Sequence, residues 1–322
     1  MFARARNSLL LLVAMAFITW YATLAMGSIS IGPDGLWRAL FSSEESLARD
    51  IVLRLRLPRG VAAFATGALL ATAGTLMQVL LRNPLADPYV LGISGGAAVG
   101  ALAVIWLGWG SGWIEAAAFA GAMLSLAIVF GLARDRGDWT PTRLLLTGVI
   151  VAAGWGALIT FMLALAPETK LRGMLFWLMG DLSAPVTPWP AAALAVVGVA
   201  AVIPFARDFN VLARGELTAA SLGVNIRLLR TYIFLASSLL TGVAVTTAGS
   251  VGFVGLVVPH LLRLAGIGDM RTLLPGAALA GGTLVLLADT LARTAIAPQQ
   301  LPVGVITAFI GVPVFLYLLR RR

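Results

Sequence analysis

Long apolar runs separated by short polar segments dominate this chain. A helix needs about 20 residues to cross a bilayer, and runs of about that length lie at residues 8–27, 60–81, 89–109, 113–133, 143–166, 188–206, 273–296 and 302–319. A longer run, 228–265, would form a helix of roughly 57 Å, almost twice the ~30 Å hydrocarbon core. Gly249, Ser250 and Gly252 offer a break within it. We therefore expect two spans there and ten transmembrane helices in total.

Basic residues set the expected orientation of these spans. Arg227 and Arg230 stand at the start of the long run, and Arg263 and Arg271 stand near its end. Because positive residues concentrate in cytoplasmic loops, both ends of the run belong inside, which requires an even number of crossings. The sequence thus predicts that both termini are cytoplasmic. The first apolar run follows basic residues, as in a signal peptide, but its removal would reverse the next span, so we expect it to be retained.

Composition agrees with a membrane protein and disfavours an enzyme. Hydrophobic residues make up 60% of the 322 residues, charged residues 11%, and the mean hydropathy is +0.95. The formal charge of +9 is spread in short clusters between apolar runs, as topology signals are, and not in a stripe for nucleic acid. The chain has no cysteine, one histidine and one lysine, so we expect no metal site and no acid–base or thiol catalysis.

Two connecting segments look too elaborate for simple loops. Residues 167–187 lie outside, and their apolar core, 174–179, is too short to cross, so we expect a short re-entrant or surface helix. Residues 206–230 lie inside, with helical character over 212–222 and a C-terminal stop at Gly223. The second segment is either a docking element for a partner or an ordinary amphipathic loop.

The heptapeptide RNPLADP at 82–88 interrupts the pattern between two apolar runs. Pro84 and Pro88 cannot continue a helix, and each pushes its predecessor, Asn83 or Asp87, towards an extended or turn conformation. The chain must turn here at a membrane surface. The hinge is either a gate or a tight connecting loop.

Few ionisable residues fall inside the predicted spans. Asp289 and Arg293 stand four residues apart, a spacing that favours a structural ion pair. His260 follows Pro259 and is more readily explained as a packed residue than as a metal ligand. Glycines at small-residue spacings, such as Gly92 and Gly96, favour close helix packing.

Several long motifs carry a family resemblance. They are LPRGVAAFATGALLATAGTLMQ at 57–78, RNPLADPYVLG at 82–92, GFVGLVVPHLLR at 252–263, LLPG at 273–276, ADTLAR at 288–293 and LPVGVITAFIGVPVF at 301–315. In this order they resemble the permease subunits of type II bacterial ABC importers for ferric siderophores, haem and cobalamin, the FecCD/BtuC-like family. The resemblance extends from about residue 50 to the C-terminus.

The resemblance implies one polytopic permease domain over residues 1–322, in a homodimer in the bacterial cytoplasmic membrane. Its expected partners are two ATP-binding cassette subunits inside, a periplasmic or lipid-anchored substrate-binding protein outside, and membrane lipid. The chain contains no GxxxxGK[ST] phosphate loop, and its only lysine, Lys170, is expected outside. We therefore expect ATP and Mg at the partner subunit, and no cofactor, metal or nucleic acid on this chain.

The resemblance also implies roles for individual residues. A cytoplasmic gate would involve Asn83, Leu85, Pro141 and Thr142, where Pro141 replaces a hydroxyl residue of some relatives and predicts a stiffer gate loop. Within the coupling segment 206–230, the element that docks the ATPase would run from Gly215 to Gly223 and include Glu216, Leu217, Ala219 and Leu222. Acidic residues of the binding protein would be received by Arg56, Arg59 and Arg293, since an arginine fork takes a carboxylate bidentately.

Family abundance favours a ferric siderophore or haem as the cargo, with cobalamin as the alternative. A secondary transporter driven by an ion gradient would also have ten spans, but it needs buried carboxylates, and Asp289 is the only candidate. A membrane enzyme lacks a catalytic cluster.

Overall fold

The computed structural model describes residues 2–42, 46–134, 139–183 and 187–320, and all regular elements of these residues are helical. The longest helices are α1 (Phe2–Ala25), α4 (Leu57–Leu80), α6 (Gly112–Ala133), α7 (Pro141–Leu165), α12 (Ile226–Ala248) and α14 (Met270–Thr294). Helix α9 (Trp189–Val202) continues through a 3-10 turn, η3 (Ile203–Phe205), into α10 (Ala206–Ala213). The predicted all-helical class of membrane protein is confirmed.

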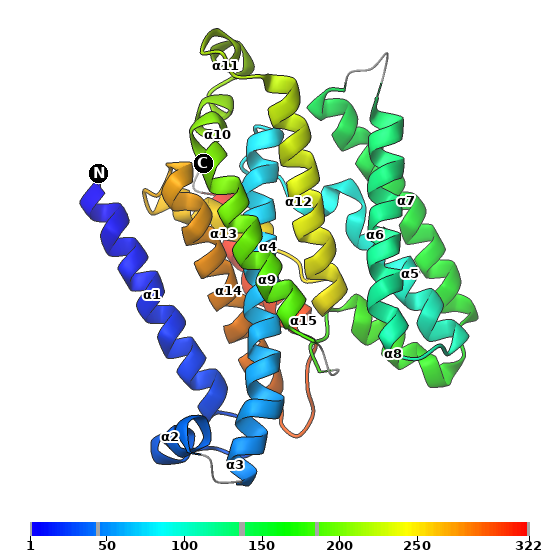
Figure 1. The fold of residues 1–322 in the computed structure, drawn as a ribbon. Coiled ribbons are helices and arrows are strands. Elements are labelled where there is room, and N and C mark those ends of the chain that lie inside the picture. Colours follow the sequence, from blue (N-terminus) through cyan, green and yellow to red (C-terminus); the bar gives the residue numbers. More distant parts are fainter. Residues whose placement is uncertain (1, 43–45, 135–138, 184–186, 321–322) are drawn as a thin grey trace.

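Seven helical stretches of the described residues are long and apolar enough to cross a membrane. Three further apolar helices are shorter: α5 (Ile93–Leu107), α13 (Val254–Leu264) and α15 (Val303–Arg320), whose apolar part is 303–317. The predicted ten spans are therefore not reached by long helices alone. The N-terminus of α1 lies at the same end of the molecule as α10 and the chain's C-terminus (Figure 1).

Helix α4 occupies the centre of the fold, packed against α14, α12, α13 and α9 (Figure 1). Of the 18 most apolar consecutive residues in the stretch that contains α4, 89% are buried, whereas only 11% of those in α7 are buried. Glycines allow this close packing: a Cβ added at Gly67 would lie 2.1 Å from the carbonyl oxygen of Gly281, and one at Gly74 would lie 1.9 Å from that of Gly255. Small residues that let backbones touch are the usual basis of helix packing in lipid.

Helices α5, α6 and α7 form a second group beside this centre (Figure 1). Gly96 of α5 and Gly121 of α6 face each other, since a Cβ on either would lie within 2.4 Å of the other's carbonyl oxygen. The predicted packing role of Gly92 and Gly96 is thus visible in the contacts. Helix α12 joins the two groups by packing on α4, α5 and α6.

The predicted break in 228–265 is confirmed. Helix α12 ends at Ala248, Gly249 takes φ +68° and Phe253 takes φ +69° before α13 begins. With 11 residues, α13 is only about 17 Å long, roughly half the hydrocarbon core, so it is not the full span that the sequence predicts.

A second irregular segment meets this break inside the protein. After α4, residues 82–87 lead into the 3-10 turn η2 (Pro88–Leu91), which shortens α5 to 15 residues. The Tyr89 hydroxyl donates to the carbonyl oxygen of Val251 and accepts from its amide, both at 3.1 Å, and the Ser94 and Ser250 hydroxyls lie 3.2 Å apart. The segment predicted as a surface hinge therefore turns back into the protein, where irregular backbone keeps its hydrogen bonds.

Short helices close both ends of the molecule. Helices α2 (Pro33–Phe41), α3 (Leu47–Asp50) and α8 (Glu168–Leu178) lie at the end opposite α10 and α11 (Figure 1), and a π-helical turn, η1 (Ile51–Arg56), connects α3 to α4. Helix α8 is the short helix predicted within 167–187, of which residues 184–186 lie outside the described residues. Its Met174 is buried, and its Lys170 Nζ donates to the carbonyl oxygen of Trp106 at 2.7 Å.

The coupling segment differs from the predicted single helix over 212–222. It forms α10 and a separate α11 (Glu216–Ser221), because Gly215 takes φ +131° and ψ 150°, a conformation that other residues rarely adopt. Gly223, at φ +80°, ends α11, as the sequence predicts.

The glycine contacts of α4 predict a large difference between two alanine substitutions. Gly74→Ala places a Cβ against the Gly255 carbonyl, so we expect a loss of about 1–3 kcal/mol of stability from forced backbone movement. Gly131→Ala, on an open helix surface of α6, should instead gain up to about 1 kcal/mol from helix propensity. Thermal unfolding in detergent measures both; equal melting temperatures would contradict the packing described here.

Candidate functional site

A cavity of about 670 Å³ opens at the start of α4, at the end of the molecule that carries α2, α3 and α8. Its lining comes from the α1–α2 connection, η1, the beginning of α4, the residues before α9 and the end of α14. The charged side chains among its described lining residues are all arginines: Arg54, Arg56, Arg59 and Arg293. Such a concentration of positive charge attracts carboxylates or other anions.

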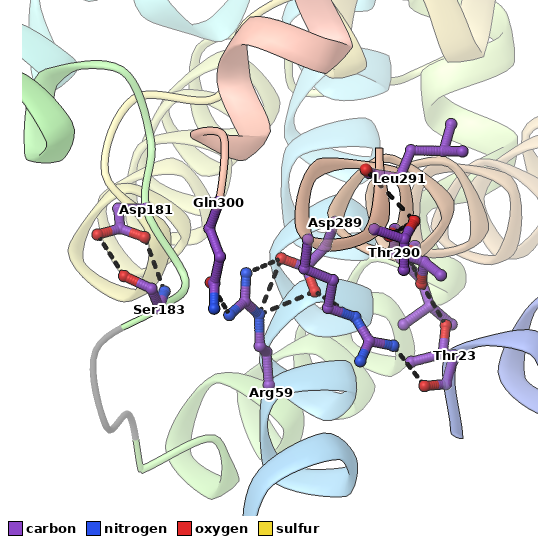
Figure 2. Close-up of polar contacts among 11 residues, drawn as sticks. Thr23, Arg59, Asp181, Ser183, Asp289, Thr290, Leu291 and Gln300 are labelled. Carbon is purple, nitrogen blue, oxygen red and sulfur yellow. Dashed lines mark hydrogen bonds and ion pairs between the residues drawn. The ribbon is translucent and has the colours of Figure 1, made fainter. Parts of the chain in front are cut away.

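A buried carboxylate holds two of these arginines. The Asp289 side chain is 1% exposed, and its Oδ1 accepts from Arg59 Nη2 at 2.8 Å. Arg59 Nε lies 3.0 Å from both carboxylate oxygens, and Arg59 Nη1 donates to Gln300 Oε1 at 2.8 Å, so Arg59 sits between Asp289 and Gln300 (Figure 2). The predicted Asp289–Arg293 pair is the longer contact, 4.0 Å from Nε to Oδ2.

Sequence reasoning missed the Arg59–Asp289 pair. The two residues are 230 positions apart, and no local spacing relates them. Since Asp289 is paired with arginine, it is not open to a coupling ion and does not supply the free buried carboxylate that a secondary transporter needs.

Arg56 has an internal role in this structure. Its side chain is buried, and its guanidinium donates to the carbonyl oxygens of Leu24 at 2.7 Å and Ala25 at 3.0 Å, and to that of Ile29. A cation on the last carbonyls of a helix stabilises its C-terminus, here that of α1. Arg56 also lines the arginine-rich cavity, so its predicted docking role stays a prediction.

At the other end of α4, Arg82 closes the helix in an unusual conformation. Its φ is +48°, and the amides of Arg82 and Asn83 each donate at 3.2 Å, to the carbonyls of Val79 and Gln78. These two bonds define a Schellman C-cap, whose left-handed position is normally glycine. An L-residue with a side chain costs roughly 1–2 kcal/mol there.

The Arg82 guanidinium pairs with the coupling segment. Arg82 Nη2 lies 3.2 Å from Glu216 Oε1, the first residue of α11, and the same oxygen contacts Arg230 Nη2 of α12. One carboxylate thereby joins the hinge, α11 and α12. Sequence reasoning identified Glu216 as part of the docking element but did not identify these partners.

The predicted gate residues divide between a turn and a helix start. Asn83 Oδ1 accepts from the Leu85 amide at 2.9 Å, which fixes the turn that Pro84 predicts. Pro141 and Thr142 are the first two residues of α7, after the N-cap Thr140. The expected stiff gate loop at Pro141 is therefore wrong: proline at the first helical position starts α7, where it loses no hydrogen bond.

The remaining coupling residues form a short helix with an apolar exposed side. Leu217 is 89% exposed and Leu222 is exposed as well, while Ala219 is buried. Gly215 and Gly223 bound α11 with positive φ values. Exposed leucines on a helix beyond the membrane spans indicate a surface for another protein.

A smaller cavity of about 310 Å³ separates the coupling segment from the end of α4. Arg82 and Asn210 are among its lining residues. Asn210 Nδ2 donates to Asp269 Oδ1 at 3.1 Å, and the same oxygen accepts from the Arg271 amide at the start of α14. The backbone bond and the Asn210 bond hold the pKa of Asp269 below its usual value. These bonds fasten α10 to α14.

The fold defines a helical membrane protein, and comparisons with known proteins give the family. Residues 12–321 match the FecCD transport family, and the chain belongs to it. It is similar to the vitamin B12 import system permease protein BtuC of Citrobacter koseri, with 40% identity over 325 residues, covering 98% of this chain and 93% of that protein. The BtuC of Salmonella typhi is 38% identical over 322 residues, covering 98% and 96%.

A solved structure has the same fold over nearly the whole chain. It is an inward-facing conformation of an ABC transporter of the metal-chelate type, with a TM-score of 0.85 and 28% identity, and the match covers 98% of this chain and 100% of that one. The chain is therefore a multi-pass permease subunit of an ABC importer and is not itself catalytic.

The buried carboxylate predicts a strong and specific loss of stability. Asp289→Asn leaves Arg59 and Arg293 without their counter-charge, so we expect a cost of about 3–5 kcal/mol. Asp50→Asn removes an exposed pair with Arg54 at 3.1 Å and should cost no more than about 0.5 kcal/mol. Thermal unfolding of the two variants in detergent compares these costs, and a similar small effect for both would contradict the role of Asp289.

Proposed function

We propose that this chain is the permease of a cobalamin importer, working as a homodimer with two ATP-binding cassette subunits and a binding protein outside. The observation that carries the cargo assignment is the 38–40% identity, over nearly the whole chain, to permeases named for vitamin B12 import. A ferric siderophore or haem, the first expectation from the sequence, becomes the second candidate. It is supported by the 28% identity to a transporter of the metal-chelate type.

We propose ten crossings, with both termini in the cytoplasm. Seven long stretches and three shorter apolar helices together supply ten elements. Two of the shorter helices, α5 and α13, are extended by the irregular segments that meet at Tyr89 and Val251. The N-terminus of α1 and the C-terminus lie at the same end as α10, as an even number of crossings requires (Figure 1).

The docking element for the ATPase is α11 with its flanking glycines, residues 215–223. Its support is the exposed Leu217 and Leu222 beside a charged cytoplasmic segment. ATP and Mg belong to the partner subunit, because this chain lacks the lysine-bearing phosphate loop.

The exposed surface of α7 is suited to packing against a second copy of this chain, which supports the proposed homodimer. Helix α7 exposes a row of small residues, Ala153, Gly156, Ala157 and Thr160, and a Cβ at Gly156 would meet no described atom within 4 Å. Small residues at this spacing let a second membrane helix approach closely. The gate proposed from Asn83, Leu85 and Thr142 would then close between two copies.

For the outer end, we propose that Arg59 receives a carboxylate of the binding protein. Arg59 remains partly exposed, with Gln300 as an exposed partner, and it lines the arginine-rich cavity. Arg293 lines the same cavity but is 10% exposed and contacts the carbonyl oxygen of Thr23, so its contribution is through charge.

The proposed cargo predicts the outcome of a reconstitution. Liposomes that contain this chain, its ATPase and its binding protein should accumulate labelled cyanocobalamin only with ATP, and a ferric hydroxamate siderophore in excess should not compete. ATP-dependent siderophore uptake without cobalamin uptake would favour the second candidate. Uptake driven by an ion gradient without ATP would contradict both.

The docking element predicts a specific assembly defect. Leu217→Asp should lower the affinity for the ATPase at least about tenfold, because a charge replaces an apolar contact at the centre of the proposed interface. Leu47→Asp is the matched control, since Leu47 is 70% exposed at the opposite end of the molecule. Co-purification and titration of the ATPase measure both. Normal affinity in Leu217→Asp would place the docking element elsewhere.

A further inference from the structure

We propose that Glu216 is a positioning residue that transmits movement of the coupling segment to the gate hinge through its ion pair with Arg82. The inference rests on the proposed docking of the ATPase at α11. It goes further by naming the contact through which docking reaches Asn83–Leu85, and no other described residue of α11 forms an ion pair with the hinge.

The contact joins segments that are distant in sequence. Glu216 begins α11, Arg82 immediately follows α4, and Arg230 lies in the second turn of α12. Glu216 is 28% exposed, Arg230 14% and Arg82 46%, so the carboxylate is partly screened from water on the side of Arg230, while its contact with Arg82 is open to solvent. Because two arginines share one carboxylate, loss of Glu216 would leave two like charges facing each other.

The backbone of Arg82 points to a use for its side chain. Among the described residues outside glycine, only Arg82 and Phe253 take a positive φ. Glycine would close the same Schellman turn without strain, and seven glycines of the described residues take a positive φ. A strained residue at a junction of moving parts is a sign of function, and here the guanidinium that glycine would lack is the group that reaches Glu216.

A displacement of the Arg82 side chain would be transmitted to the turn at Asn83–Leu85. Arg82 is covalently followed by Asn83, whose side chain caps the turn at Leu85, so the three residues move together. On the other side of Arg82, the side-chain Nε2 of Gln78 in α4 donates to the carbonyl oxygen of Leu256 of α13 at 3.2 Å. A pull on Glu216 therefore acts on the turn, while α4 and α13 hold the other side.

The test is the amount of cargo moved per ATP hydrolysed by the reconstituted complex. Arg82→Gly removes the guanidinium and relaxes the backbone, so we expect an unchanged or higher melting temperature and normal ATPase assembly, with transport per ATP reduced at least fivefold. Glu216→Gln, a second variant independent of the backbone, should show the same loss. Arg82→Lys, which keeps the charge, should recover at least half of the ratio.

The matched control is Arg134→Gln. Arg134 is an exposed arginine at the C-terminal end of α6 that lies over the Phe130 ring instead of pairing with Glu216, and this variant should transport normally. Wild-type transport per ATP in both Arg82→Gly and Glu216→Gln would overturn the inference. Failure of the docking proposal is seen separately, as normal ATPase affinity in Leu217→Asp.

Discussion

Backbone contact through glycine, which keeps α4 straight and central, is the constraint on which the rest of the structure depends. Gly67 lies against Gly281 of α14 and Gly74 against Gly255 of α13, at distances that leave no room for a Cβ. In a bilayer, where burial of apolar surface gives little drive between helices, such close packing supplies the association energy. The same helix carries Arg59 near its start, and Arg82 follows its C-cap Leu81, so its position also fixes where these two arginines lie.

Each end of α4 uses one carboxylate to hold two arginines, with different consequences. At the end that begins α4, Asp289 is almost fully buried, and its contact with Arg59 fastens α4 to α14, which also carries Arg293. At the end that follows α4, Glu216 is partly exposed, and its contacts with Arg82 and Arg230 join α11 to the hinge and to α12. Burial makes the first arrangement costly to break, and exposure lets the second exchange partners. We read the first as structural and the second as movable.

The sequence predicts features that depend on local chemistry. Apolar run length gives the helices, Gly249 marks the break before α13, and the short core at 174–179 gives α8. It does not predict contacts set by the tertiary fold: Arg59 meets Asp289 across 230 residues, and Arg56 turns inward onto the end of α1. The break at Gly215 was missed because a single glycine within an apolar pattern is compatible with a helix, and Pro141 was misplaced because proline suits a helix start as well as a loop.

The most direct test of this account is whether α4 keeps its length when the complex binds ATP. The chain has no cysteine, so spin labels can be placed at Leu55, which is exposed just before α4, and at its half-buried C-cap Leu81, about 40 Å apart if the intervening segment is helical. Pulsed electron–electron double resonance on complexes in which one copy of the chain is labelled should give one narrow distance that is the same in the nucleotide-free and ATP-bound states, because the glycine contacts hold α4 in place. A shift of several ångströms between the two states would show that α4 bends, and would contradict its role as the rigid connection between the two ends.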